Sequence, residues 1–283
     1  MTGDVLVERE GPTVLLTFNR PDARNAMTFE MYEALHDTCA NLDADPGVRV
    51  LVLKGAGDRA FASGTDIRQF LDFKTREDAL GYEARLTRVL ARLAGMSKPT
   101  IAMLQGDAIG GGLFIALACD LRLAAPHARF GVPVARTLGN FLAPLSLSLL
   151  VAALGPGRAR ELVLTARLLD AAEAKAVGLI DRIHPAPELE SRVRELAASL
   201  AELAPLTRAS RARWFNETPD VANFSCWKDE RWRIPSSWLE RLGTRVRPPA
   251  GWRASRSVGS ALGRSRLRIP RPAEPASSCC SSC

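Results

Sequence analysis

Long apolar segments are scarce in this sequence of 283 residues. The longest one, residues 141–154, contains Pro144 and two serines and is too short to cross a bilayer. The first ten residues, MTGDVLVERE, have neither the basic nor the apolar region of a secretory signal. These absences predict a cytoplasmic protein with no membrane partner.

Cysteine is also too sparse to suggest a disulfide framework. Three cysteines are scattered along the chain, at Cys39, Cys119 and Cys226, and the other three fall within the last five residues. Wide spacing of this kind predicts reduced, buried thiols.

An excess of positive charge is missing from most of the chain, although the net charge is +7. Residues 231–283 contain 11 Arg, no Lys and 2 Glu, so residues 1–230 are mildly acidic. A basic surface for nucleic acid or for membranes is therefore conceivable only in this tail, and binding of either is the least favoured hypothesis. We expect no nucleic-acid partner.

Strand and helix patterns alternate up to about residue 224, which favours a layered α/β domain. Strands are expected before residue 20, at 48–55 and 100–106, and in the short segments 121–125, 128–133 and 179–184. Helices are expected at 28–45, 77–96, 111–119, 141–154, 157–166, 170–177 and 187–204. We expect a core over residues 1–185, a helical segment over 186–224 and a tail over 225–283. The tail is rich in Arg, Pro and Ser, and is expected to be disordered or to be an out-of-frame translation.

Two glycine-containing segments follow predicted strands, DRAFASGTDI (58–67) and GDAIGGGL (106–113). Ligands bind beyond the carboxyl ends of strands in open α/β sheets, and backbone N–H groups at helix starts attract negative charge. Two such N–H groups that converge form an oxyanion hole for a carbonyl oxygen. The alternative is that Gly110–Gly112 only let a helix pack closely on the sheet.

Five segments resemble, in order and spacing, the crotonase superfamily, which is the enoyl-CoA hydratase/isomerase group of acyl-CoA enzymes. They are NRPDARNAMT (19–28), LVLKGAGDRAFASGTDI (51–67), KPTIAMLQGDAIGGG (98–112), LACDLRLAA (117–125) and ARFGVPVARTLG (128–139). The resemblance extends from about Val5 to Leu206. It implies a β/α spiral core with a C-terminal helical segment, assembled as a homotrimer or a dimer of trimers. It also implies a lyase or isomerase acting on an acyl-CoA thioester, with coenzyme A as part of the substrate and no separate cofactor.

The resemblance assigns roles to individual residues. The N–H groups of Thr65 and Gly111 match the family's oxyanion hole, and Gly110 adjoins it. The backbone of Ala62, Ser63 and Gly64 matches the segment that holds the CoA adenine. Arg68 matches a position near the CoA phosphates, and Arg24 is a weaker match. A solvated surface charge explains Arg68 equally well and explains Arg24 better. Asp66 is better explained as a helix cap than as a catalytic group.

The pattern fails at the positions where hydratases of this family place two glutamates, because Phe114 and Val134 stand there. Neither side chain can transfer a proton, so standard hydration of an enoyl thioester is not expected. Thr137 and Asn140 fall where a loop lines the pocket and are suited to positioning a water or a carboxylate, as in decarboxylation. Of the remaining polar residues, Asp107 is expected in a turn and His127 at the surface. Tyr82 and Glu83 are expected on a helix surface, with the alternative that they reach the pocket from its other wall.

The sequence therefore leaves two main hypotheses open. One is an acyl-CoA lyase or isomerase whose proton carriers are not identified. The other is a non-catalytic acyl-CoA-binding protein.

Overall fold

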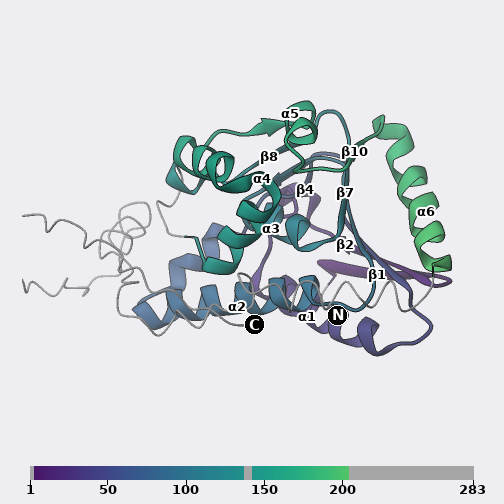
Figure 1. Cartoon of the computed structure of the whole chain (residues 1–283). Coiled ribbons are helices and arrows are strands. Elements are labelled where there is room, and N and C mark those ends of the chain that lie inside the picture. The colour runs from purple at the N-terminus through teal and green to yellow at the C-terminus, as the bar shows by residue number, and fades with distance from the viewer. Residues whose placement is uncertain (1–2, 137–141, 204–283) are drawn as a thin grey trace, which may run out of the picture. The chain divides into compact units, whose positions relative to one another are not determined.

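The computed structural model describes residues 3–136 and 142–203. Within these ranges, two β-sheets and their helices form an α/β fold (Figure 1). The strands are β1 (Val5–Glu10), β2 (Thr13–Phe18), β3 (Val50–Gly55), β4 (Ala60–Ala62), β5 (Thr100–Leu104), β6 (Asp107–Ile109), β7 (Leu121–Ala124), β8 (Arg129–Gly131), β9 (Leu169–Asp170) and β10 (Arg182–Ile183). The helices are α1 (Phe29–Ala44), α2 (Arg76–Ala94), α3 (Gly111–Ala118), α4 (Pro144–Thr165), α5 (Ala171–Ala176) and α6 (Ala186–Glu202).

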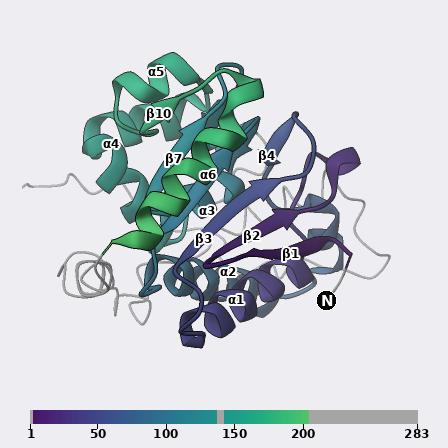
Figure 2. The ribbon, with the colours of Figure 1, turned by 90° about the vertical axis from the view of Figure 1, so that its right-hand side faces the viewer.

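The large sheet has six strands in the order β1-β2-β3-β5-β7-β10. All neighbours are parallel except β1 and β2, which form an antiparallel pair. Helix α6 lies across one face of this sheet, as Figure 2 shows. Its buried residues recur every fourth position and pack against the apolar side chains of that face, including Val52 and Ile101. Strands covered on both faces explain the continuous apolar run of β3.

The small sheet has four strands in the order β4-β6-β8-β9. Strands β4, β6 and β8 are parallel, and β9 is antiparallel to β8. Each contains only two or three residues, too few for an apolar alternation to stand out in the sequence. Three of them, β4, β6 and β9, lie in segments that the sequence had not predicted as strands.

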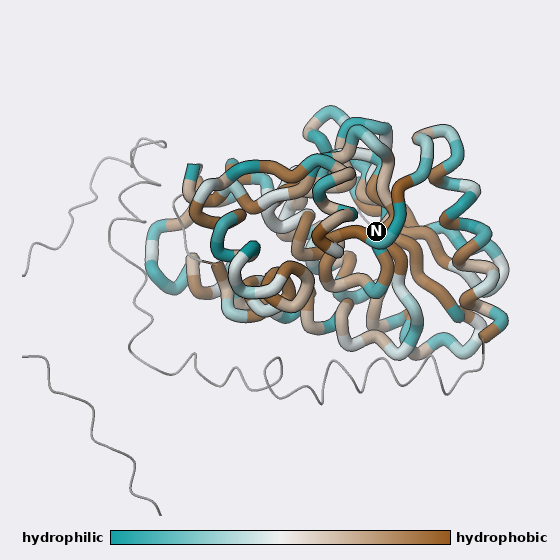
Figure 3. Tube along the Cα trace, turned by 45° about the horizontal axis from the view of Figure 1, so that its top comes forward, coloured by the Kyte–Doolittle hydropathy of each residue, from teal (hydrophilic) through white to brown (hydrophobic). Residues whose placement is uncertain are grey.

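Helix α3 lies at the centre of the main core. Every residue of α3 from Gly112 to Ala118 is buried, so the helix is apolar on all sides. Helices α1, α2 and α4 pack around it, and brown, apolar backbone follows this interior in Figure 3 while teal gathers on outer turns. The half-buried glycine turn before α3 is thereby anchored to the main core.

The expected helices are confirmed, with one change in their division. The patterns at 141–154 and 157–166 are two halves of α4, which bends at Gly155, where φ is +74°. The expected strand at 179–184 is reduced to Arg182–Ile183. Cys39 and Cys119 are buried, as predicted, and Cys226 lies outside the described residues. No helix in the described ranges is long and apolar enough to span a bilayer.

Candidate active site

The two glycine-containing loops emerge side by side from the small sheet. Residues 62–65 follow β4, and the glycine turn follows β6, its parallel neighbour. Parallel strands end at the same edge of a sheet, which is where open α/β folds bind ligands. The sequence predicted that the glycine turn directly follows the strand at 100–106. This prediction is wrong, because the short strand β6 lies between them.

The glycines allow these loops to touch. Gly64 has a φ of +103°, and a Cβ there would lie 3.3 Å from the carbonyl oxygen of Ile109. A Cβ on Gly112 would overlap the carbonyl oxygen of Ala62. Gly110 precedes α3 with a φ of +54°. Close packing is thus a sufficient reason for glycine at position 112, as the alternative interpretation proposed, whereas Gly64 and Gly110 also need the left-handed conformation.

Thr65 and Gly111 present backbone N–H groups near one another. A Cβ on Gly111 would lie 3.7 Å from the nitrogen of Thr65, so the two residues are in direct contact. Three nearby N–H groups are used within the fold: Asp66 donates to Met27, Gly110 to Gly131, and Phe114 to Gly110. Those of Thr65 and Gly111 have no acceptor among the described residues. The structure therefore leaves two adjacent donors available to a ligand oxygen.

Three hydroxyl groups form a chain beside these donors. The Thr65 Oγ1 lies 2.9 Å from the Tyr32 hydroxyl and 2.8 Å from the Tyr82 hydroxyl. A Cβ on Gly111 would overlap the Tyr32 hydroxyl, so this group lies directly against the glycine turn. Burial raises the pKa of both tyrosines, which therefore remain neutral hydrogen-bond donors. The expectation of a surface position for Tyr82 is wrong, because α2 turns its buried face toward α1 and α3.

Glu83 follows Tyr82 at the edge of the same buried face. It lies one turn from Ala79 and Leu86, both of which are buried, and is itself half-buried. No hydrogen bond or ion pair reaches its carboxylate from the described residues. Burial raises the pKa of this carboxyl to about 7, and its charge contributes to the raised pKa of Tyr32 and Tyr82. Sequence reasoning placed Glu83 on the surface, and the only signal against that was its i+4 spacing from Ala79.

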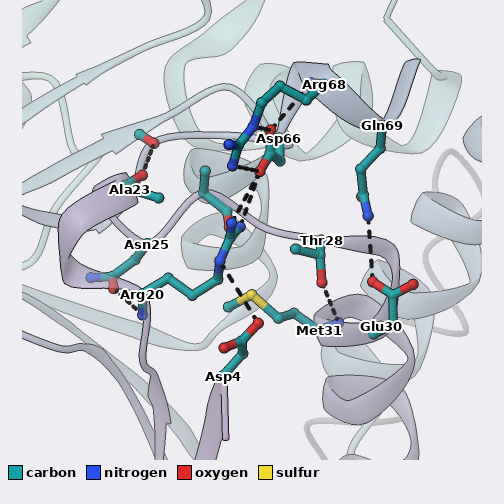
Figure 4. A network of polar contacts seen from close by, with 12 residues as sticks. Asp4, Arg20, Ala23, Asn25, Thr28, Glu30, Met31, Asp66, Arg68 and Gln69 are labelled. Atoms are coloured by element: carbon teal, nitrogen blue, oxygen red, sulfur yellow. Dashed lines mark hydrogen bonds and ion pairs between the residues drawn. The ribbon is translucent and has the colours of Figure 1, made fainter. Parts of the chain in front are cut away.

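Asp66 anchors the first loop through a network of charges (Figure 4). Its carboxylate accepts a hydrogen bond from the Arg68 backbone and forms ion pairs with Arg68 at 2.7 Å and Arg20 at 3.2 Å. The hydrogen bonds from Arg68 are the main cause of its pKa of about 2. The expected capping role is confirmed, since Asp66 caps the 3₁₀ helix Ile67–Asp72.

The two arginines predicted near CoA phosphates lie on this loop and beside it. The Arg68 side chain is 70% exposed although it pairs with Asp66. Arg24 has a φ of +51°, and its carbonyl accepts a hydrogen bond from the Ser63 N–H at 3.1 Å. The backbone of Arg24 thus ties the loop down, while the phosphate contacts of both arginines remain predictions.

Comparison with known proteins agrees with this geometry. A sequence model of the family described as enoyl-CoA hydratase/isomerase matches residues 8–222. A short-chain-enoyl-CoA hydratase from Clostridium acetobutylicum is 34% identical over 206 residues, covering 72% of this chain and 77% of that protein. The chain belongs to the enoyl-CoA hydratase/isomerase family.

Solved structures of this family share the fold. An enoyl-CoA hydratase/carnithine racemase from Magnetospirillum magneticum has a TM-score of 0.74 at 29% identity, over 88% of this chain and 96% of that one. A monofunctional enoyl CoA isomerase from M. smegmatis has a TM-score of 0.65 at 35% identity, over 79% and 97% of the two chains. The expected crotonase-like α/β fold is confirmed, and its relatives include both hydratases and isomerases.

Apolar side chains occupy the two positions where this enoyl-CoA hydratase/isomerase family member departs from the expected glutamates. Phe114, on α3, is 3% exposed, and Val134 is half-buried and packs against the main core. Thr137 and Asn140 lie outside the described residues.

The other polar candidates interact with residues outside the two glycine-containing loops' donor pair. Asp107 stands on β6 and pairs with Arg129 at 2.6 Å, so the expectation that it lies in a turn is wrong. His127 is exposed, as expected, and its Nε2 lies 3.2 Å from the Asp58 carbonyl oxygen.

Proposed function

We propose that this protein binds an acyl-CoA thioester and stabilises the enolate formed from it. The observation that carries the proposal is the pair of adjacent N–H groups on Thr65 and Gly111 with no acceptor among the described residues. Membership of the enoyl-CoA hydratase/isomerase family supports a thioester as the ligand. Both donors bind the thioester carbonyl oxygen, where negative charge develops as the enolate forms.

The position of Gly111 makes its backbone N–H a stronger hydrogen-bond donor. It is the first residue of α3, so the positive end of the helix dipole faces the same oxygen. One donor of an oxyanion hole contributes about 10²–10³-fold in rate, and a buried site favours this effect because water does not compete. The backbone alone thus supplies a large part of the stabilisation that an enolate requires.

The coenzyme A part of the ligand follows the first loop in this proposal. The adenine lies against the backbone of Ala62, Ser63 and Gly64, and Gly110 leaves room for the thioester beside them. Arg68 and Arg24 contact the phosphates. The exposure of the Arg68 guanidinium is compatible with this role, since it can bind a phosphate while Asp66 holds it in place.

The reaction is of the lyase or isomerase type, with proton transfer by groups other than those at positions 114 and 134. Phe114 and Val134 give the acyl pocket an apolar wall in place of two carboxylates. That wall also favours a second candidate, a decarboxylation in which the oxyanion hole supplies the main stabilisation. A thioester-binding protein without turnover is the remaining alternative.

Infrared spectroscopy tests the proposed hole directly. Crotonyl-CoA labelled with ¹³C at the carbonyl is expected to show a lower carbonyl stretching frequency when bound, because two donors polarise it. A CoA thioether of the same chain length, which lacks that oxygen, is expected to bind more weakly in calorimetry. Equal affinity together with an unshifted carbonyl would contradict the proposal. Mass spectrometry of a panel that includes crotonyl-CoA and malonyl-CoA then distinguishes hydration, decarboxylation and no turnover.

The family resemblance also predicts the assembly. We propose a homotrimer or a dimer of trimers, and light scattering of the full chain measures the mass. A monomer in solution would contradict this part of the proposal.

A further inference from the structure

Glu83 is an unusual residue to find on the inner side of α2. A half-buried carboxylate without a partner loses hydration and gains nothing in return from the described residues. A mere surface role does not explain why its charge helps to raise the pKa of both Tyr32 and Tyr82. A reacting group in the site would explain it.

The elements packed against α2 bring no charge to offset that of Glu83. Helix α3 and the first half of α4, residues 144–154, contain no titratable residue. Helix α1 contributes the neutral Tyr32 and also Glu33, which is paired with Arg85 and Arg88 of α2. The nearest charges of the first loop, on Asp66 and Arg68, are paired with each other. Helix α1 also carries Glu30, His36, Asp37 and Asp43, but no cation of the described residues forms an ion pair with Glu83.

The hydroxyl chain leads from Tyr82, the residue next to Glu83, to one of the oxyanion donors. Tyr82 directly precedes Glu83 on α2, and its hydroxyl is bonded to the side chain of Thr65, whose own N–H is one of the donors. The chain from Tyr32 to Tyr82 contains three hydroxyl protons and two internal hydrogen bonds, so one proton remains for an acceptor outside it. The glycine turn, the first loop and α2 thus meet within a few ångströms.

We propose that Glu83 is the catalytic acid and base of this protein, which moves a proton to and from the carbon next to the thioester carbonyl. The proposal rests on the proposed function. The carboxylate of Glu83 takes the α-proton, so that a C–H bond breaks and an O–H bond forms. The electron pair of the C–H bond moves into the enolate, whose oxygen is held by the Thr65 and Gly111 N–H groups. The carboxylic acid then returns the proton to carbon, and no other reactant is consumed.

The protonation behaviour of the cluster fits this role. Burial raises the pKa of Glu83 to about 7, so both of its forms are populated near neutral pH. A general base is most effective when its pKa is close to the working pH. Tyr32 and Tyr82 stay neutral there and cannot replace it.

Exchange of the α-protons of butyryl-CoA in D₂O tests the proposal. Butyryl-CoA has no double bond, so exchange needs only proton removal and return, and mass spectrometry counts the deuterium gained. Glu83→Gln is expected to slow exchange at least 100-fold, within the usual range for loss of a general base. Its affinity for butyryl-CoA in calorimetry is expected to stay within about threefold of the wild type, as for any variant that keeps the oxyanion donors. Glu83→Asp is expected to recover part of the rate.

A pH profile and a matched control complete the experiment. The wild-type exchange rate is expected to rise with pH and level off above a midpoint near 7, as the base becomes ionised. Glu83→Gln is expected to lose that midpoint. Glu77→Gln changes an exposed glutamate on the first turn of the same helix and is expected to exchange like the wild type.

Two results would overturn the role of Glu83. One is binding of butyryl-CoA with no exchange by the wild type, and the other is exchange by Glu83→Gln at the wild-type rate. Failure of the wild type to bind any thioester is a different result, which would refute the proposed function itself.

Discussion

The two sheets of this protein have different structural roles. The large sheet has strands of up to six residues, is covered on both faces and carries α6 on its outer side. The small sheet has strands of two or three residues, yet both loops of the candidate active site emerge from it. The comparison teaches that the long strands carry the apolar contacts with α6, whereas the short strands position the loops of the candidate site.

The two sheets also differ in what their glycines do. In the large sheet, side chains fill the space between strands and helices, and stability comes from apolar burial. In the small sheet, bare backbone lets β4 approach α3 more closely than any side chain would permit. Substitutions in the two regions should therefore have different signatures.

Ile101→Ala is expected to give the largest loss of stability. Ile101 is fully buried on the face of β5 that α6 covers, and such a truncation costs about 2–5 kcal/mol in the free energy of unfolding. Denaturant titration measures the loss, and thioester binding by the folded protein is expected to be unchanged. Leu164→Ala, at a position 72% exposed, serves as the control and should cost far less. If folded Ile101→Ala bound the thioester more weakly than the wild type, the large sheet would contribute to binding as well as to stability, and this comparison would be wrong.

Glu83→Gln is expected to make stability less dependent on pH. The pKa of Glu83 is about 7 in the folded protein against a usual 4.5, so the folded state binds the proton more tightly than the unfolded state. Stability from this source is complete below pH 4.5 and is lost as the pH rises through about 7. The half-buried position reduces the effect to about 2 kcal/mol. Denaturant titrations at pH 5 and pH 8 should show a loss in the wild type that is smaller in Glu83→Gln.

Gly112→Ala tests the close packing between β4 of the small sheet and α3. The added Cβ meets the carbonyl oxygen of Ala62, so β4 and α3 must move apart. We expect a cost of about 1–3 kcal/mol, as for other overpacked sites. Thioester affinity should also fall, because the Thr65 and Gly111 donors move with those elements. Calorimetry of the folded variant measures this.

The matched control for that substitution lies on a helix. Gly81, in α2, has open space around the added Cβ. Gly81→Ala should therefore stabilise the protein by about 0.5–1 kcal/mol, through helix propensity. If Gly112→Ala behaved in the same way, close packing at Gly112 would be refuted.

Asp66→Asn is expected to have a small effect, which is to lower stability near neutral pH and to reduce the loss of stability in acid. The folded pKa of Asp66 is about 2 against a usual 3.8, so its contribution is complete above pH 4 and is lost as the pH falls through about 2. We expect the wild type to lose about 1–2 kcal/mol more than Asp66→Asn between pH 5 and pH 2. Denaturant titration at these two pH values measures the difference. An identical loss in both proteins would show that the network in Figure 4 adds no stability.

The sequence predicted the long elements and the two glycine loops, and it missed the connections between them. Continuous apolar runs such as that of β3 and periodic helices such as α2 carry strong local signals. Strands β4 and β6 are three residues long, and they exist because neighbouring backbone pairs with them. The local sequence of such a short strand does not indicate that pairing.

The side chains of the candidate site were harder to predict than its backbone. Thr65 and Gly111 follow from glycine positions along the chain. Tyr32 and Tyr82 come from two helices, and their hydroxyls meet at Thr65 only because α1, α2 and α3 pack together. A single helix shows that a residue lies near a buried stripe, but not which loop faces that stripe.

The hydroxyl chain has a practical consequence, because Tyr32 and Tyr82 are the two tyrosines in the sequence. Any tyrosinate absorbance in an alkaline titration therefore originates at the candidate active site. Burial raises the pKa of both groups, so no tyrosinate absorbance should appear near pH 10 while the protein is folded. The absorbance should appear when α1 and α2 separate. The absorbance of the two tyrosines therefore reports whether α1 and α2 remain packed together at the candidate active site.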